Sequence, residues 1–362
     1  MTFVRRRLFV FFEESESGVL MQKSVLVTGG GGYIGSVLTE LLLEAGHRVK
    51  VLDRFFFGRD LVAPLERNER LTVVKADVRY TTKDLFEGID VVMDLAGISN
   101  DPASDLAPRI TEEVNFEGPV HMATLAKQAG VSRYLFSSSC SIYGHGQEER
   151  LDEESSKAPV SLYARTKIQA EEQLVKLNDE RFAVTFLRNA TVYGLSHRMR
   201  FDLVINLMTL YAWKNRRIYV LGGGRQWRPV VHVKDVGRAF MLVMDAPVEK
   251  IAGQAFNVGS NEQNYQIYRL AQMVRDVVPH TDLEMVPDDP DKRTYNVSFD
   301  KIQKVLEYRV EKTPYEGIVE VKQALEQGRT EDSIKTKTVH YYQYLLDAER
   351  TLKEISYEGR IF

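Results

Sequence analysis

Tyr163 and Lys167 are the residues of this 362-residue chain whose types and spacing point most directly to chemistry. They are four residues apart in a segment, residues 163–177, whose apolar spacing predicts a helix, so both side chains project from one face. An ammonium beside a phenol lowers the pKa of the phenol from its usual value of about 10. We therefore expect Tyr163 to transfer protons. A solvated helix face is the alternative, since Tyr308 and Lys312 have the same spacing without other signs of a site.

Hydroxyl side chains follow a strand that the sequence predicts over residues 133–137. Four serines stand at its carboxyl end, namely Ser137, Ser138, Ser139 and Ser141. Ligands of parallel sheets bind at the carboxyl ends of the strands, so these hydroxyls are expected near a substrate. We predict that Ser139 orients a substrate alcohol. For Ser137 and Ser138 the favoured interpretation is a hydrogen-bonded turn.

A glycine-rich loop lies between a predicted strand, residues 24–28, and a predicted helix, residues 34–45. Glycine allows a tight turn and a close approach of the backbone to a pyrophosphate, and the following helix offers unpaired N–H groups to that anion. A flexible glycine turn is the alternative interpretation. The residues that we predict to contact a dinucleotide here are Gly29, Gly32, Tyr33, Ile34 and Gly35.

Asp53 ends the next predicted strand, eighteen residues after Gly35. An acidic side chain at this point accepts hydrogen bonds from the adenosine ribose and repels a 2′-phosphate, which favours NAD over NADP. Arg54 keeps NADP open, because an arginine beside the carboxylate can accommodate a phosphate. A cap on a strand-end turn is the alternative role for Asp53.

The elements that must position these residues alternate between strands and helices from residue 24 onward. Such alternation predicts an α/β fold with a doubly wound parallel sheet, the Rossmann arrangement, joined to a smaller mixed α/β substrate lobe. We divide the chain into an N-terminal extension (1–20), an NAD-binding domain (21–187), a substrate-binding lobe (188–327) and a C-terminal helical tail (328–362).

Composition excludes several classes of protein. The chain has 48 basic and 51 acidic side chains and a net charge of -3, so no overall field predicts a nucleic-acid or membrane partner. No stretch approaches the roughly 18 apolar residues of a membrane span. Cys140 is the single cysteine, which excludes an internal disulfide and a multi-cysteine zinc site and fits a cytoplasmic protein. We expect no metal.

Three segments together resemble the extended short-chain dehydrogenase/reductase family, in its NAD-dependent nucleotide-sugar epimerase/dehydratase branch. They are the loop 28–35, the serine segment 137–144 and the helix start 162–167, and the resemblance covers residues 24–327. It implies that Tyr163 is the acid and base, and that Lys167 holds the nicotinamide ribose and tunes Tyr163. It also implies a sugar-nucleotide substrate.

The same resemblance implies further contacts, for which packing, capping or a surface charge are the alternatives. The implied cofactor contacts are Asp77, Val78, Leu95, Ala96, Gly97 and Asn115. The implied substrate contacts are Ser141, Thr191, Arg228 and Arg293, with Thr191 standing where many relatives have asparagine. A homodimer joined through the Tyr163 helix is implied as well, with Ile168 and Leu174 as its apolar contacts.

Cys140 and Ser141 depart from the family, because its dehydratases carry an Asp-Glu pair there and its decarboxylases a glutamate. We therefore predict an epimerase that inverts C4 of the sugar through a transient 4-keto intermediate. A net 4-dehydrogenase or ketoreductase is one alternative, and a catalytically idle NAD-binding regulator is another. Residues 196–203 are similar to a segment of enzymes that act on deoxysugars or heptoses. Binding of the nucleotide is the alternative role for this segment.

Overall fold

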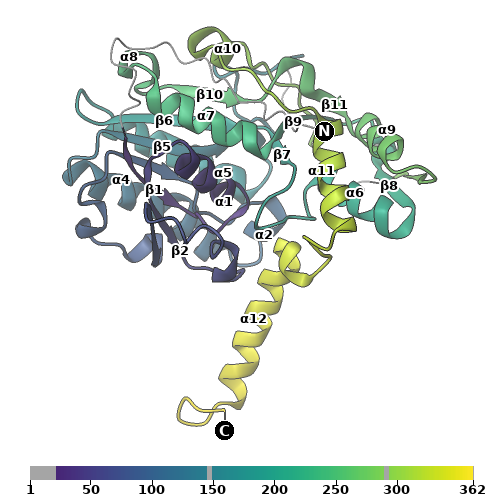
Figure 1. Cartoon of the computed structure of the whole chain (residues 1–362), viewed down its shortest axis with the longest axis horizontal. Helices are drawn as coiled ribbons and strands as arrows, with labels where there is room; N and C mark the ends of the chain where they lie inside the picture. Colours follow the sequence, from purple (N-terminus) through teal and green to yellow (C-terminus); the bar gives the residue numbers. More distant parts are fainter. Residues whose placement is uncertain (1–21, 145–148, 289–292, 362) are drawn as a thin grey trace, which may run out of the picture.

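A seven-stranded parallel sheet forms the centre of the molecule (Figure 1), in the strand order β10-β6-β5-β4-β1-β2-β3. Its strands are β1 (Ser24–Thr28), β2 (Arg48–Asp53), β3 (Leu71–Lys75), β4 (Val91–Asp94), β5 (Arg133–Ser139), β6 (Ala183–Asn189) and β10 (Ala255–Val258). The order reverses between β1 and β4, which creates a crevice at the carboxyl ends of these strands. The predicted doubly wound sheet is confirmed.

This computed structural model describes residues 22–144, 149–288 and 293–361. The predicted N-terminal extension, residues 1–20, lies outside the described residues. No helix in the described part of the chain is long and apolar enough to cross a membrane.

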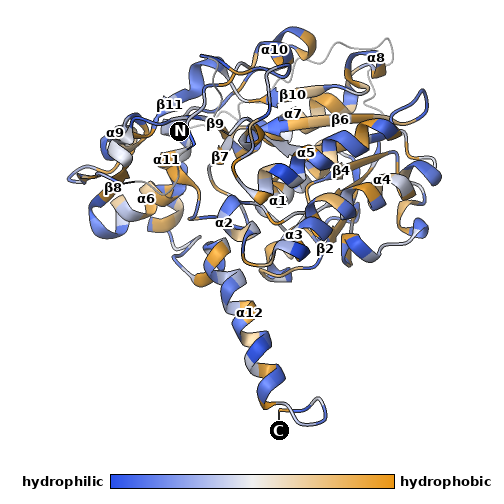
Figure 2. Ribbon diagram, turned by 180° about the vertical axis from the view of Figure 1, so that it is seen from behind, coloured by the Kyte–Doolittle hydropathy of each residue, from blue (hydrophilic) through white to orange (hydrophobic). Residues whose placement is uncertain are grey.

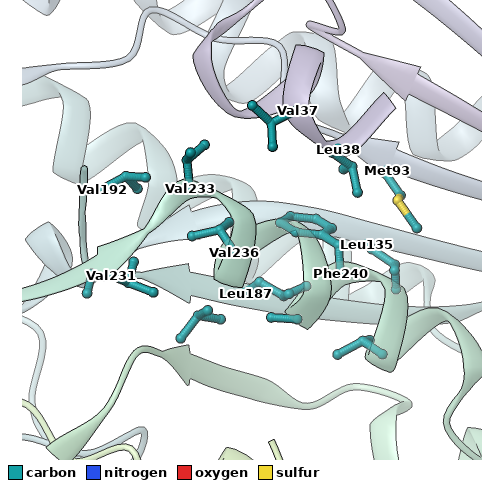
Figure 3. Close-up of a cluster of buried hydrophobic side chains, with 14 of the residues drawn as sticks. Val37, Leu38, Met93, Leu135, Leu187, Val192, Val231, Val233, Val236 and Phe240 are labelled. Atoms are coloured by element: carbon teal, nitrogen blue, oxygen red, sulfur yellow. The ribbon is translucent and has the colours of Figure 1, made fainter. Parts of the chain in front are cut away.

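Helices cover both faces of the large sheet because its strands are apolar on both sides. Val25 and Val27 of β1 face one core, while Leu26 between them faces the other. The first core contains α1 (Tyr33–Glu44) and α7 (Val233–Asp245), as Figure 3 shows for side chains of both helices. The second contains α4 (Gly118–Gln128) and α5 (Leu162–Leu174). Between β4 and α4 lie α2 (Asp101–Ser104), α3 (Pro108–Glu112) and the π-helical turn η4 (Glu113–Glu117).

A smaller lobe lies at the carboxyl edge of the large sheet. Its two small sheets have the orders β11-β9-β7 and β12-β8. Their strands are β7 (Thr191–Tyr193), β8 (Arg217–Leu221), β9 (Trp227–His232), β11 (Asn264–Gln266) and β12 (Asp282–Val286). The remaining helices are α6 (Val204–Asn215), α8 (Val248–Ile251), α9 (Ile267–Val277), α10 (Asp300–Leu306), α11 (Pro314–Glu326) and α12 (Thr338–Ile355).

Two details of the predicted organisation need correction. Although α7 and β10 lie within residues 188–327, they belong to the large sheet and its helical layer, since β10 pairs with β6. The two lobes therefore alternate along the chain. In α5, Leu174 is fully buried in the second core of its own chain and cannot contact a partner subunit. The homodimer itself stays a prediction.

Helix α12 projects away from the rest of the molecule (Figure 1). Hydrophobic residues recur along it among hydrophilic ones (Figure 2), and its last two turns are exposed. Its first turns pack on the segment that follows β2, where Phe57 contacts the rings of Tyr341 and Tyr342.

Candidate active site

A cavity of about 1150 Å³ opens at the crevice between the two lobes. This volume exceeds the range of roughly 300–1,000 Å³ that is typical of pockets for one small ligand. Every residue that the sequence assigned to the site lines it, except Asn115. The fold thus brings together residues from the glycine loop to Arg293.

The glycine loop is built for close contact with a ligand backbone. Gly29 has a φ of +66°, and a Cβ there would lie 2.8 Å from the backbone N of Ala96. A Cβ at Gly35 would lie 2.1 Å from the carbonyl oxygen of Gly29, so only glycine lets α1 begin this close to the loop. The N-terminus of α1 therefore faces the cavity with unpaired N–H groups, an arrangement that fits the pyrophosphate of NAD.

Asp53 is held at the base of this loop. Its carboxylate accepts hydrogen bonds from the backbone N–H of Gly31 at 2.9 Å and of Phe55 at 2.6 Å. Burial raises the pKa of Asp53, and these two backbone bonds oppose the shift. Arg54 does not face Asp53, because its guanidinium is paired with Asp77 at 2.9 Å. This arrangement supports the prediction that the cavity disfavours the 2′-phosphate of NADP.

We expect the parent protein to bind NAD more tightly than NADP, and Asp53→Ala to shrink the ratio of the two affinities by about tenfold, which is about 1.4 kcal/mol. The reason is that a carboxylate repels the extra phosphate. Calorimetric titration with both dinucleotides measures the ratio, with Asp60→Ala, an exposed position outside the cavity, as the control. Tighter binding of NADP by the parent would refute the role of Asp53.

Tyr163, Ser139 and Ser141 form a short chain of hydroxyl groups. Ser141 lies 2.9 Å from Ser139, oxygen to oxygen, and Ser139 forms a hydrogen bond with Tyr163. Burial raises the pKa of Tyr163 to about 12, with a contribution from the Asp101 carboxylate, while the bond to Ser139 opposes the shift. Tyr163 is therefore a phenol at neutral pH, and Ser139 stabilises the phenolate when the proton leaves.

Lys167 differs from the expectation in one respect. Its Nζ donates to the carbonyl oxygen of Ser137 at 2.8 Å and lies 5.9 Å from the centre of the Tyr163 ring. Burial lowers the pKa of Lys167 to about 8, although Asp94 and Glu171 oppose the shift. The net lowering of the Tyr163 pKa that the sequence predicted is not found, because burial outweighs the groups that favour the phenolate, of which Ser139 and Arg200 have the largest effects.

Asn115 supports the site from behind instead of lining it. It is fully buried in η4, and its amide forms two hydrogen bonds with Ile98: Oδ1 accepts from the backbone N–H at 2.8 Å, and Nδ2 donates to the carbonyl at 3.0 Å. These bonds fix the loop after β4 that contains Gly97. Asn115 therefore positions this loop and does not itself form the cofactor contact that the resemblance implies.

Asn189 and Asp101 are among the polar residues of the cavity that the sequence analysis missed. Asn189, at the end of β6, donates to Ser137 Oγ at 3.0 Å, and its buried Oδ1 has no hydrogen-bond partner in the described part of the chain. Its place after a buried strand was a signal of the kind that identified Ser139. Asp101, at the start of α2, pairs with Arg293 and accepts a hydrogen bond from Ser161. No local pattern identified it.

The two arginines of the smaller lobe meet at the far end of the cavity. Arg228 is buried, donates to the carbonyl oxygens of Trp227 and Arg293, and lies over the Tyr295 ring. Arg293 reaches across to Asp101 of the first lobe. Thr191 also lines the cavity. Two guanidinium groups at one end of the cavity can bind a diphosphate.

Known proteins resemble this chain over most of its length. UDP-glucuronic acid decarboxylase 1 of Xenopus tropicalis is 26% identical over 337 residues, which are 90% of this chain and 73% of the relative. The dTDP-D-glucose 4,6-dehydratase of Mus musculus is 28% identical over 272 residues, 72% and 75% of the two chains. UDP-glucuronic acid 4-epimerase from Bacillus cereus, solved with UDP-glucuronic acid and NAD, shares the fold with a TM-score of 0.73 at 23% identity, over 84% of this chain and 99% of that chain.

Residues 25–259, well over half of the chain, match a family that is described as NAD dependent. The match includes the glycine loop, Ser139, Tyr163 and Lys167. It confirms the predicted resemblance, the predicted cofactor and the prediction that the protein is an enzyme. The chain belongs to the NAD dependent epimerase/dehydratase family.

Proposed function

We propose that this enzyme is a nucleotide-sugar epimerase that inverts C4 of the sugar through a transient 4-keto intermediate. The observation that carries the proposal is that the turn after Ser139 contains Cys140 and Ser141 and no carboxylic acid. Cys140 points away from the cavity, with its Sγ donating to the carbonyl oxygen of Arg188 at 3.1 Å. Ser141 faces the cavity and bonds to Ser139. The turn therefore offers hydroxyl groups for one alcohol and no carboxylic acid for an elimination.

The residues of this chain divide the work of oxidation and reduction. Bound NAD supplies a reversible hydride acceptor beside the sugar carbon. Tyr163 takes the proton of the C4 hydroxyl as the ketone forms and returns it when the alcohol forms again. In this proposal Ser139 holds the reacting oxygen, and Lys167 binds the nicotinamide ribose. Inversion requires the keto sugar to turn over before reduction, for which the cavity has room.

Asp101 is the carboxylate that most affects this proposal. Elimination of water needs both an acid and a base, and carboxyl groups suit these roles. Asp101 lies close enough to Tyr163 to raise its pKa, but its two oxygens are taken up by Ser161 and Arg293. Asp101 is the one carboxylate among the groups that most affect the pKa of Tyr163, whereas dehydration requires two carboxyl groups beside the reacting carbons. The arrangement favours epimerisation over dehydration.

Incubation with candidate UDP- and dTDP-sugars in deuterated water tests the reaction type. We expect C4-inverted products of unchanged mass, without accumulation of free NADH, because hydride leaves and returns to the same carbon. A 4-keto product lighter by the elements of water would overturn the proposal. Stoichiometric release of NADH without an added acceptor would instead establish the net dehydrogenase.

The nucleotide-sugar substrate is supported by the relatives, whose names specify UDP- and dTDP-linked sugars. We also propose a cytoplasmic location, with which the buried thiol of Cys140 agrees. The homodimer is proposed to form through α5, in which Ile168 is partly buried against the first core. Val160 and Val175, which lie just outside the two ends of this helix, are exposed.

A further inference from the structure

Helix α12 turns one face toward the cavity. Val339, Tyr342, Leu345 and Leu346 all line it, and they recur at the spacing of one helical face. The same cavity is also lined by apolar residues from the segments that follow β3 and α2, among them Val78 and Ile110. Apolar lining of this kind fits a flat group such as a nucleobase.

The base of α12 is fixed beside the end of β2. The Phe57 ring packs at a tilt against the rings of Tyr341 and Tyr342, with ring centres 5.3 and 5.5 Å apart. Asp332, in the segment that leads into the helix, pairs with Lys214 and Lys337 at 2.7 Å each. These contacts place Tyr342 near the Asp53 carboxylate, which is one of the groups that raise the pKa of Tyr342 after burial. The helix therefore borders the part of the cavity where the adenosine ribose is expected.

Arg198 is a buried cation in the same place. It is 4% exposed and stacks 3.7 Å above the Phe57 ring, and Nη2 donates to Thr338 of α12 at 2.9 Å. Nε has no hydrogen-bond partner, and no carboxylate of the described residues forms an ion pair with Arg198. Burial lowers the pKa of Arg198 to about 10, so the charge persists at neutral pH. A buried, unpaired guanidinium that lines a cavity is a site for an anion.

We propose that α12 and Arg198 form the outer wall of the subsite for the adenosine diphosphate half of NAD. The apolar face of α12 covers the adenine, and Arg198, oriented by Thr338, binds the pyrophosphate opposite the N-terminus of α1. The proposal rests on NAD as the cofactor of the proposed function but does not depend on the reaction at C4. It assigns a role to Arg198, within residues 196–203, and to α12 of the C-terminal tail, neither of which takes part in the reaction at C4.

A pair of leucines on the same helix provides the test of the apolar wall. Leu346 lines the cavity, whereas Leu352 is 43% exposed and lies outside it. We expect Leu346→Asp to weaken the binding of ADP-ribose and of NAD by at least about tenfold, since base stacking and burial contribute this much or more. Leu352→Asp should bind both as the parent does. The readout is calorimetric titration, which requires no turnover.

Titration of the same variants with UDP identifies the ligand that α12 covers. Unchanged UDP affinity in Leu346→Asp, together with weakened ADP-ribose binding, supports the adenosine subsite. Weakened UDP binding with unchanged ADP-ribose binding would overturn the proposal, because α12 would then border the substrate. Equal affinities of both leucine variants for ADP-ribose would overturn it as well. If light scattering shows that Leu352→Asp dissociates a dimer of the parent protein, α12 is part of a dimer contact. That result would also overturn the proposal.

Arg198→Met tests the anion site separately. Methionine keeps much of the side-chain volume and removes the charge. We expect the thermal unfolding midpoint of the ligand-free protein to stay or rise, because an unpaired buried charge is lost, while ADP-ribose binds at least about tenfold more weakly. A residue with only a structural role would instead lower the midpoint and leave ADP-ribose binding unchanged, which would refute the assignment.

Discussion

Tyr163→Phe is expected to lose about 10²–10⁴-fold in turnover, the range that a positioned acid-base group contributes. The substitution removes one oxygen and keeps the ring. The backbone N–H of residue 163, which donates to Ser104 Oγ at 3.2 Å, is unaffected. Binding of NAD and the unfolding midpoint should therefore stay as in the parent. Initial rates with the identified sugar nucleotide, together with calorimetric titration of NAD, measure the two properties.

Tyr219→Phe is the matched control for this experiment, because Tyr219 lines the same cavity but is 43% exposed. Its turnover should be close to that of the parent. Ser139→Ala should also lose turnover, since the hydroxyl chain to Tyr163 is broken. Near-parental turnover of Tyr163→Phe would show that another group transfers the proton and would remove Tyr163 from the mechanism.

Glu171→Gln is expected to destabilise the fold by about 3–5 kcal/mol, the typical cost of leaving one partner of a buried ion pair uncompensated. Glu171 and Arg188 are each 4% exposed and form two hydrogen bonds, at 2.8 and 3.0 Å. Glu171 also accepts from Ser138 at 2.6 Å, so the pair lies directly behind the serine segment. Urea unfolding at pH 7 measures the difference.

The double variant Glu171→Gln, Arg188→Met serves as its control. Removing the buried charge of Arg188 as well should recover much of the lost free energy of unfolding, because both partners of the ion pair are then replaced. If Glu171→Gln alone costs less than about 1 kcal/mol, the pair is better solvated than the structure indicates.

The same pair has a predictable pH dependence. Burial alone would raise the pKa of Glu171, but Arg188 holds it below its ordinary value of 4.5. A lowered pKa in the folded state means that this contribution is present above pH 4.5 and is lost as the pH falls through the folded value. The stability difference between the parent and Glu171→Gln should accordingly be constant near neutral pH and shrink below pH 4.5.

The sequence predicted the parts of this molecule that are encoded locally. The strand over residues 24–28, the glycine turn and the helix after it can be recognised because each depends on neighbouring residues, as does the spacing of Tyr163 and Lys167. The predicted bounds of β1 and the predicted end of β2 at Asp53 are those of the structure. Ser139 was placed correctly for a similar reason, since it ends a strand of a parallel sheet.

What could not be predicted depends on contacts between distant segments. Asp101 and Arg293 meet although 192 residues separate them, and Arg198 reaches Thr338 over 140 residues. The return of β10 to the large sheet is decided by its pairing with β6, which leaves no trace in the pattern of residues 255–258. The pKa of Tyr163 was predicted in the wrong direction because burial, which spacing does not report, outweighs a neighbouring charge.

The bond pair between Asn115 and Ile98 has a thermodynamic consequence. The Asn115 side chain bonds both the N–H and the carbonyl of Ile98, as a residue of a neighbouring strand would. The loop after β4 is therefore ordered as if it were part of the sheet. Fixing the backbone of one residue costs roughly 1–2 kcal/mol of conformational entropy. Here that entropy is lost during folding instead of during association with the dinucleotide. A loop ordered in advance leaves more of the contact energy for the affinity toward the dinucleotide.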